Sequence, residues 1–350
     1  MSTLFSHFFA KINQISPLEA DFTEVLGTIA VMPKTLYFYG KMPQNMVKSP
    51  KSRNQSGNKS HNIPSSQSTT KNRTRRPKTV AIVGSRHNTR YGEEVAYKLA
   101  YELGRRGVIV VSGLAFGIDS IAHRGCLDAG GTTIAVLGTP IDDIYPVPHK
   151  GLAAEIVEKG GAVISEYPPH TAEYKDAPLA PGEYYDERGR RAQDPKGSFL
   201  HRNRIISGLS DIVVVVEAAE KSGSLNTAAH ALAQGRTVFA VPGNITSPYS
   251  QGCNKLISQG AIPYTEPSDV LRELFPEDYA KHIKRQATLQ LFGDNDVETK
   301  ILQAIHAGAR SGEQIMALTH LPPEVMNQSL TMLELGSRIR SLGMNHWGLC

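Results

Sequence analysis

Cysteines are few and widely spaced in this 350-residue chain, at Cys126, Cys253 and Cys350. They form no CxxC pair, so neither a disulfide framework nor a thiolate zinc site is indicated, and a reducing cytosol is the expected compartment. Long apolar runs are also missing, because no stretch approaches the roughly 20 apolar residues of a membrane span. The apolar start LFSHFFA is short and lacks the preceding basic segment of a secretion signal. We therefore expect a cytoplasmic protein with no membrane partner.

Common signatures of cofactor and catalytic sites are absent as well. Only Gly84 fits a GxGxxG fingerprint after the first predicted strand, and the second strand ends in Ser112, where a dinucleotide site needs an acidic residue. No Walker A, GxSxG or HExxH motif occurs, and the histidines show no ligand spacing. Carboxylates at strand ends have no nucleophile beside them, and we interpret them as loop-fixing groups: Asp119, Asp142, Asp143 and Glu166. We expect no catalytic residues, no metal and no cofactor.

Positive charge is concentrated in one segment. The formal net charge is +5, yet residues 48 to 78 hold nine Lys or Arg and no Asp or Glu. Subtracting those nine charges leaves −4 for the rest of the chain, so the folded parts cannot hold DNA by diffuse attraction. Residues 44 to 78 are predicted to be a basic disordered linker, which acts as a solvated spacer or contacts phosphates weakly.

Strand and helix signals alternate regularly from Thr79 onward, which predicts an α/β fold with an extended Rossmann-like, doubly wound and mostly parallel sheet. Strands are expected in TVAIV, VIVVS, TTIAVLG, AVISE, DIVVVV, TVFAVPG and AIPYT, and helices near 91–106, 117–129, 151–159, 201–209, 222–235 and 252–259. A polar segment from 170 to 197 interrupts the series. Upstream, PKTLYFYG is expected to add a short strand to the sheet.

An anion site is predicted where the DIVVVV strand ends. The turn Ser222, Gly223, Ser224 opens the next helix, whose free N–H groups and dipole favour a phosphate or carboxylate. Arg202 and Arg204, one element upstream, supply the countercharge in this interpretation. The alternative is that the Ser-Gly-Ser turn only caps its helix.

Two further segments point to single-stranded nucleic acid. Gly84 and Ser85 let the backbone approach a ligand, and Arg86 can then pair with a phosphate. In FLHRNRIISGLS, Phe199 beside the two arginines and Asn203 offers both base stacking and phosphate contacts. The alternative places Phe199 in the core and pairs the arginines with Glu166 or Glu217.

The C-terminal residues are predicted to form a separate winged-helix-like domain. Three short helices, VETKILQAIHAG, SGEQIMALTH and PPEVMNQSLTMLELG, precede a hairpin in RIRSLGMNHWGL. The third helix carries no Lys or Arg, which favours protein contact over DNA reading. The expected domains are an N-terminal segment (1–43), the basic linker (44–78), a Rossmann-like DNA-binding domain (79–275), a linker (276–295) and the winged-helix-like domain (296–350).

From Thr79 to Leu271 the chain resembles the DNA-processing protein A (DprA or Smf) family. The resemblance lies in VGSR, SGLAFGIDSIAH, AVLGTPIDDIYP, ISEYPP, FLHRNRIISGLSD, VVEAAEKSGSLNTA and VFAVPGN. It implies a homodimeric, non-enzymatic protein that binds single-stranded DNA without sequence preference, protects it and loads the RecA recombinase in natural transformation. Carried over by position, the implied DNA-binding residues are Gly84, Ser85, Arg86, Phe199, Arg202, Asn203 and Arg204, with Ser222, Gly223 and Ser224 nearby.

The chain departs from the family pattern at Pro140, where a glycine is usual, and in the polar segment 170–197, which lengthens a short connection. Two other functions are open. One is a nucleotide-cleaving phosphoribohydrolase, although EKSGSLNTAAH lacks the glutamate of the PGGxGTxxE signature. The other is a protein adaptor that acts through the C-terminal domain.

Overall fold

The computed structural model describes residues 11–20, 22–43, 76–170, 179–181, 183–185, 191–193, 195–277 and 292–349. The chain divides into two units, Met1–Leu274 and Phe275–Cys350, and each is described by itself. The predicted basic linker up to residue 75 and most of the predicted linker 276–295 lie outside the described residues, so both stay predictions.

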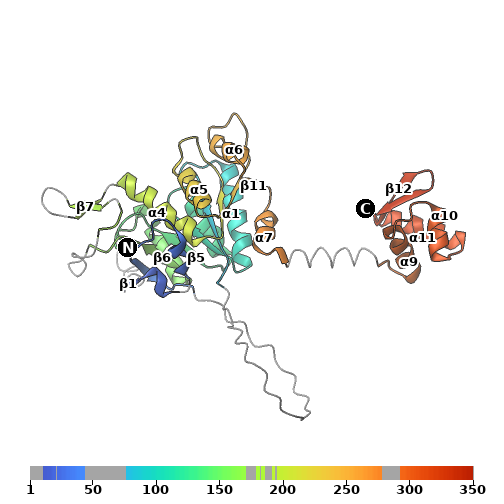
Figure 1. Ribbon diagram of the computed structural model, residues 1–350, viewed down its shortest axis with the longest axis horizontal. Coiled ribbons are helices and arrows are strands. Elements are labelled where there is room, and N and C mark those ends of the chain that lie inside the picture. Colours follow the sequence, from blue (N-terminus) through green and yellow to red (C-terminus); the bar gives the residue numbers. More distant parts are fainter. Residues whose placement is uncertain are drawn as a thin grey trace, which may run out of the picture. The chain divides into compact units, whose positions relative to one another are not determined.

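A nine-stranded sheet forms the centre of the first unit, in the order β1-β2-β6-β5-β4-β3-β9-β10-β11. Figure 1 labels β1, β5, β6 and β11 of this sheet among the helices of the unit. The strands from β6 to β11 in this order are parallel, while β2 pairs antiparallel with β6 and β1 antiparallel with β2. Their bounds are β1 Asn13–Ile15, β2 Leu36–Gly40, β3 Thr79–Val83, β4 Ile109–Ser112, β5 Thr133–Val136, β6 Ala162–Ser165, β9 Ile212–Val215, β10 Thr237–Ala240 and β11 Ile262–Pro263. The predicted doubly wound, mostly parallel sheet is confirmed.

Helices connect the parallel strands: α1 Arg90–Arg105, α2 Ile118–Asp128, α3 Lys150–Glu158, α4 Pro195–Leu209, α5 Gly223–Ala233 and α6 Gln251–Ser258. Helix α7 Pro267–Leu274 follows the last strand, β11. Strands β3, β4, β5, β6 and β9 are buried along their whole length, which is why their sequences are continuous apolar runs. The core between the sheet and its helices therefore fixes the strand ends that carry the loops.

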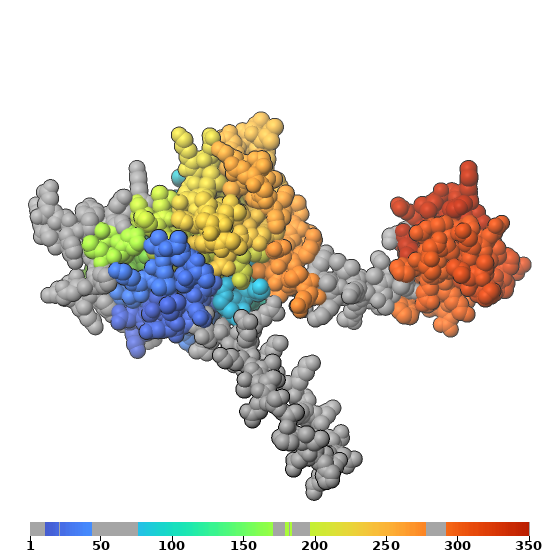
Figure 2. Space-filling view, viewed as in Figure 1, coloured from blue at the N-terminus to red at the C-terminus, as the bar shows by residue number. Residues whose placement is uncertain are grey.

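The N-terminal segment belongs to this unit. Strand β2 extends the sheet as predicted, and β1, which the sequence analysis does not predict, forms the outer edge. Phe22 and Leu26 are buried in the same core as the parallel strands. Figure 2 shows the blue N-terminal surface directly against the green and yellow surface of the parallel domain.

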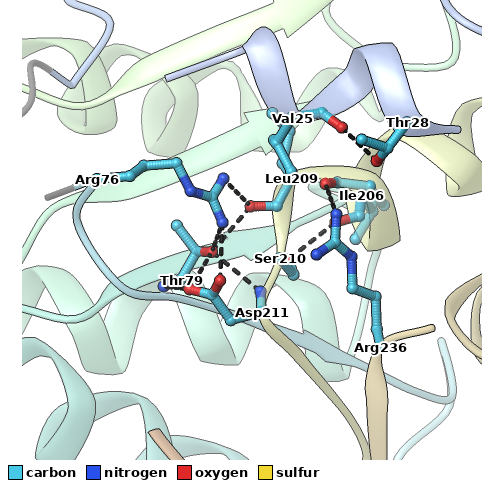
Figure 3. Close-up of polar contacts among 10 residues, drawn as sticks. Val25, Thr28, Arg76, Thr79, Ile206, Leu209, Ser210, Asp211 and Arg236 are labelled. Carbon is cyan, nitrogen blue, oxygen red and sulfur yellow. Dashed lines mark hydrogen bonds and ion pairs between the residues drawn. The ribbon is translucent and has the colours of Figure 1, made fainter. Parts of the chain in front are cut away.

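The amino ends of β3 and β9 are joined by a polar cluster (Figure 3). Arg76 donates to an Asp211 carboxylate oxygen at 2.9 Å and to the Leu209 carbonyl at 3.1 Å. The other Asp211 oxygen accepts from the Thr79 backbone N–H at 2.9 Å and from its hydroxyl at 3.1 Å. Arg76 is therefore held in the folded unit, although the sequence analysis assigns it to the basic linker.

In the polar segment 170–197, β7 Glu183–Tyr185 and β8 Arg191–Gln193 pair as a separate antiparallel ribbon. The second unit contains α9 Asp296–His306, α10 Gly312–Thr319, α11 Pro323–Leu335 and a hairpin of β12 Ile339–Gly343 with β13 His346–Leu349. Its own apolar core includes Ile301, Ile305 and Leu330. The predicted order of three helices and a terminal hairpin is confirmed.

Candidate nucleic-acid interface

The candidate site lies where the order of the parallel strands reverses. After β3 the chain builds β4, β5 and β6 on one side, and β9, β10 and β11 lie on the other. The loops that leave the carboxyl ends of β3 and β9 diverge there, which is where open α/β sheets bind ligands. A cavity of about 630 Å³ opens at this point. It is lined by Gly84, Ser85, Arg86, Phe199, Arg202, Asn203, Ser222, Gly223 and Ser224, among others.

The N-terminus of α5 forms one wall of this crevice. The Ser222 side chain caps the helix, because its hydroxyl oxygen accepts from the Ser224 N–H at 3.3 Å. Asn203 holds the turn from α4, donating to the Gly223 carbonyl at 3.2 Å and to the Asn226 side-chain oxygen at 3.2 Å. A Cβ at Gly223 would have nothing within 4 Å, so the start of the helix is open to the crevice. Ser222 therefore caps α5, while the positive end of the helix dipole stays accessible from the crevice.

Arg86 and Phe199 also line the crevice. Arg86 is exposed, and its guanidinium carbon lies 5.5 Å from the centroid of the Phe199 ring, a cation–π distance. Among the residues that the structure describes, no ion pair involves Arg86. Its charge is available to a phosphate. Phe199 is half-buried and keeps contact with the crevice, so it is not a core residue.

Lys221 adds a second exposed cation that the sequence analysis missed. It lines the crevice immediately before the Ser222 cap. Like Arg86, it makes no ion pair among the described residues. The sequence could have indicated Lys221, because it directly precedes the predicted Ser222-Gly223-Ser224 helix start and therefore lies beside the helix N-terminus.

Arg202 forms the floor of the crevice, and backbone carbonyls occupy much of its guanidinium. It is 4% exposed and donates to the Gly113 carbonyl at 2.8 Å and to the Val136 carbonyl. Burial lowers the pKa of Arg202 to about 10, opposed by the nearby Asp119 carboxylate, so the side chain stays protonated at neutral pH. A Cβ at Gly113 would lie 2.7 Å from this guanidinium, which requires glycine there. Arg202 therefore ties the loops after β4 and β5 together and places a positive charge under the crevice.

Arg204 is not in the crevice. Its guanidinium makes a two-pronged ion pair with Glu166, at 2.7 and 2.6 Å, and both side chains are almost fully buried. It also donates to the carbonyls of Val31 at 2.8 Å and His201 at 2.9 Å. This corrects the expectation that Arg204 faces a phosphate. The pairing with Glu166 is the alternative that the sequence left open.

Other strand-end groups fix the loops. Glu217, at the end of β9, accepts from the Thr89 N–H at 2.8 Å and from its hydroxyl at 2.6 Å, which joins the loops after β3 and β9. Asp119 is buried, accepts from the Gly113 N–H at 3.1 Å, and has its pKa raised by that burial. A Cβ at Gly84 would lie 2.6 Å from Ile118, so glycine permits the first turn to pack against α2. These contacts support the interpretation of the acidic side chains as loop-fixing groups.

His123 lies fully buried in α2, and its Nδ1 is 2.7 Å from the Thr133 hydroxyl oxygen. That hydroxyl donates to the Val110 carbonyl, so it accepts from His123, whose other ring nitrogen has no partner in the described structure. Burial lowers the pKa of His123 to about 3, so the ring is neutral. Among the described residues no cluster of three or more His, Cys, Asp or Glu side chains is arranged to hold a metal ion. No helix in the described ranges is long and apolar enough to cross a membrane.

The fold and the crevice define a doubly wound α/β protein, with a crevice lined by cationic and aromatic side chains, followed by a winged-helix unit. The chain belongs to the DNA recombination-mediator protein A family, whose model matches residues 69–178 and 184–275. The DprA winged helix domain matches residues 285–343. The family match is interrupted only within the polar segment 170–197.

Two curated relatives show the extent of the similarity. Protein Smf of Escherichia coli (strain K12) is 47% identical over 195 residues, which cover 56% of this chain and 46% of that protein. DNA processing protein DprA of Bacillus subtilis (strain 168) is 42% identical over 195 residues, which cover 56% and 58% respectively. The match therefore spans about half the length of these relatives.

Two solved structures agree with the fold. DNA processing protein A from Streptococcus pneumoniae has a TM-score of 0.55 and 33% identity, with 77% of this chain and 76% of that chain covered. DNA processing protein A from Helicobacter pylori, whose structure is described for its single-stranded DNA binding mode, has a TM-score of 0.55 and 26% identity, with 78% and 98% covered.

Proposed function

We propose that this protein binds single-stranded DNA without sequence preference, protects it and loads the RecA recombinase on it during natural transformation and recombination, without itself catalysing a reaction. The observation that carries the proposal is the crevice between β3 and β9. There, an exposed guanidinium on an aromatic ring lines the same cavity as the N-terminus of a helix.

Each part of this crevice matches one part of a single strand. The phosphates can bind to Arg86, Lys221 and the N–H groups at the start of α5. Such contacts involve no base edge, so they do not depend on the sequence. The Phe199 ring suits the face of any base, and such stacking tolerates every sequence. A paired duplex hides its base faces, so the arrangement favours single strands.

The relatives support the same ligand. The Helicobacter pylori structure concerns single-stranded DNA, and the family is described as a recombination mediator. Nucleotide cleavage by a phosphoribohydrolase is the weaker alternative, because the start of α5 reads GSLNTAAHALA and offers no glutamate to the crevice. The adaptor function is a second candidate, because α11 reads PEVMNQSLTMLEL and carries no cation for a DNA groove.

The test is binding of a fluorescent oligo-dT to the full chain, with unlabelled single strands of mixed sequence and a duplex of equal length as competitors. We expect all single strands to compete equally and the duplex to compete poorly. Equal competition by the duplex, or no binding, would contradict the proposal. Release of free base from nucleoside monophosphates would favour the enzyme instead.

Two finer parts of the proposal need their own measurements. RecA loading predicts that the protein raises the rate of RecA filament nucleation on single strands. The adaptor function predicts that deletion of 296–350 leaves oligo-dT affinity intact. If that deletion abolishes only the RecA effect, the adaptor function is also supported. The expected homodimer predicts twice the chain mass in sedimentation equilibrium.

A further inference from the structure

Two exposed aromatic rings lie beside the crevice and take no part in the core. Phe116, in the loop after β4, is 44% exposed, and Tyr145, in the loop after β5, is 45% exposed. Both line one small cavity together with Arg86 and Phe199. Exposed aromatic side chains that gather at one place mark binding surfaces more often than isolated ones do.

Their positions are fixed by neighbours. The Phe116 ring meets the His149 ring edge-on, with centroids 4.8 Å apart, and His149 is itself buried and donates from Nδ1 to the Leu114 carbonyl at 2.7 Å. Tyr145 lies against Phe199 with centroids 5.6 Å apart and planes tilted by 44°. A rigid, exposed ring loses little conformational entropy when a flat partner stacks on it.

The aromatic surface is continuous with the phosphate crevice. Arg86, Tyr145 and Phe199 line both the large crevice and the small aromatic cavity. The supporting strands are neighbours in the order β9, β3, β4, β5, so the features follow one another along the carboxyl edge of the sheet. The series begins at the start of α5 and ends at Tyr145.

The length of this edge fits a short run of nucleotides. Three strand spacings of about 4.8 Å give roughly 14 Å between β9 and β5. At a rise of about 3.4 Å per nucleotide this corresponds to about four nucleotides, and to fewer if the strand is stretched.

We propose that a single strand bound in the crevice continues across the ends of β4 and β5, where Phe116 and Tyr145 stack bases beyond the one on Phe199. This inference rests on the proposed function and adds a second base-stacking site to it. The chemical class of the ligand is the nucleobase, and no base edge is read. The strand then runs from the α5 phosphate position toward β5.

The test compares the full-length wild type with Phe116→Ala/Tyr145→Ala. The control is Tyr97→Ala, which removes a 40% exposed tyrosine from α1 that lines neither cavity. The probes are an octanucleotide and a dinucleotide of dT, the second measured by competition. A 2-aminopurine placed in turn at each position of the octanucleotide reports stacking as fluorescence quenching.

We expect the double variant to bind the octanucleotide at least about 30-fold more weakly, because two stacked bases are lost. Phe116→Ala alone, whose ring lines only the small cavity, should leave dinucleotide binding unchanged. In the double variant, 2-aminopurine quenching should disappear at positions to one side of the crevice. Trp in place of Ala at position 116 should restore the quenching. If the wild type binds and the double variant binds both probes equally well, the second stacking site is wrong while the proposed function stands. A changed sedimentation mass with unchanged DNA binding would also overturn it and assign the rings to a protein interface. If the wild type binds no oligonucleotide, both proposals fail.

Discussion

Replacing Arg204 tests whether this arginine supports the fold or contacts DNA. Arg204→Met removes the two-pronged ion pair and leaves the Glu166 carboxylate without a countercharge at 2% side-chain exposure. Breaking a buried pair on one side costs about 3–5 kcal/mol, because the remaining charge is desolvated and unpaired. The carbonyls of Val31 and His201 also lose a donor, which adds to the cost.

The assay is urea unfolding of three proteins, with oligo-dT affinity measured under conditions where each is folded. We expect Arg204→Met to lose about 3–5 kcal/mol and the double variant Arg204→Met/Glu166→Leu to regain most of it, since an apolar pair needs no countercharge. Oligo-dT affinity should stay within twofold of wild type in all folded samples. Full stability with a large loss of affinity in Arg204→Met would refute the assignment and restore the phosphate contact that the sequence predicts.

Three further predictions test contacts within the first unit. Gly113→Ala should lower the free energy of unfolding in urea by about 1–3 kcal/mol, because its Cβ would lie 2.7 Å from the Arg202 guanidinium. The control Gly223→Ala, whose Cβ meets nothing within 4 Å, should lower it by less than about 1 kcal/mol. His123→Asn should make the free energy of unfolding less dependent on pH below neutrality. Since burial lowers the folded-state pKa of His123 to about 3 and the unfolded value is about 6.5, the wild type should lose about 2 kcal/mol more than the variant between pH 6.5 and pH 5. Equal losses would contradict the neutral buried ring. Asp211→Ala should cost about 1–3 kcal/mol, because the Thr79 N–H and Arg76 lose their acceptor, and Asp211→Asn should cost less.

The parallel core could be predicted from the sequence because its strands are buried runs and its loops recur at regular spacing. Strand β1 could not, since NQI is short and half-exposed and its pairing with β2 is a tertiary contact. Helix α4 begins at Pro195, six residues before the predicted start near 201. Proline is tolerated in the first turn of a helix. Gly197 and Ser198 have low helix propensity, so the sequence gives no helix signal for this turn.

The crevice was predictable because parallel strands end at one edge, which brings Gly84, Arg86 and Ser222 together. The different environments of Arg202 and Arg204 could not be predicted, although helix geometry explains why the two differ. At 3.6 residues per turn, side chains two positions apart point about 200° from each other, so the pair cannot face one pocket. Which of the two faces the crevice depends on how α4 packs, and only the structure supplies that.

The measurement that most directly tests the central claim is the salt dependence of oligo-dT binding by wild type and Arg86→Ala/Lys221→Ala. Each phosphate contact on a single strand contributes about −0.7 to the slope of log K against log salt. We predict that the double variant binds more weakly and that its slope is shallower by about 1.4, with Lys255→Ala, an exposed lysine outside the crevice, as the matched control. An unchanged slope and affinity in the double variant would contradict the crevice between β3 and β9 as the DNA-binding site.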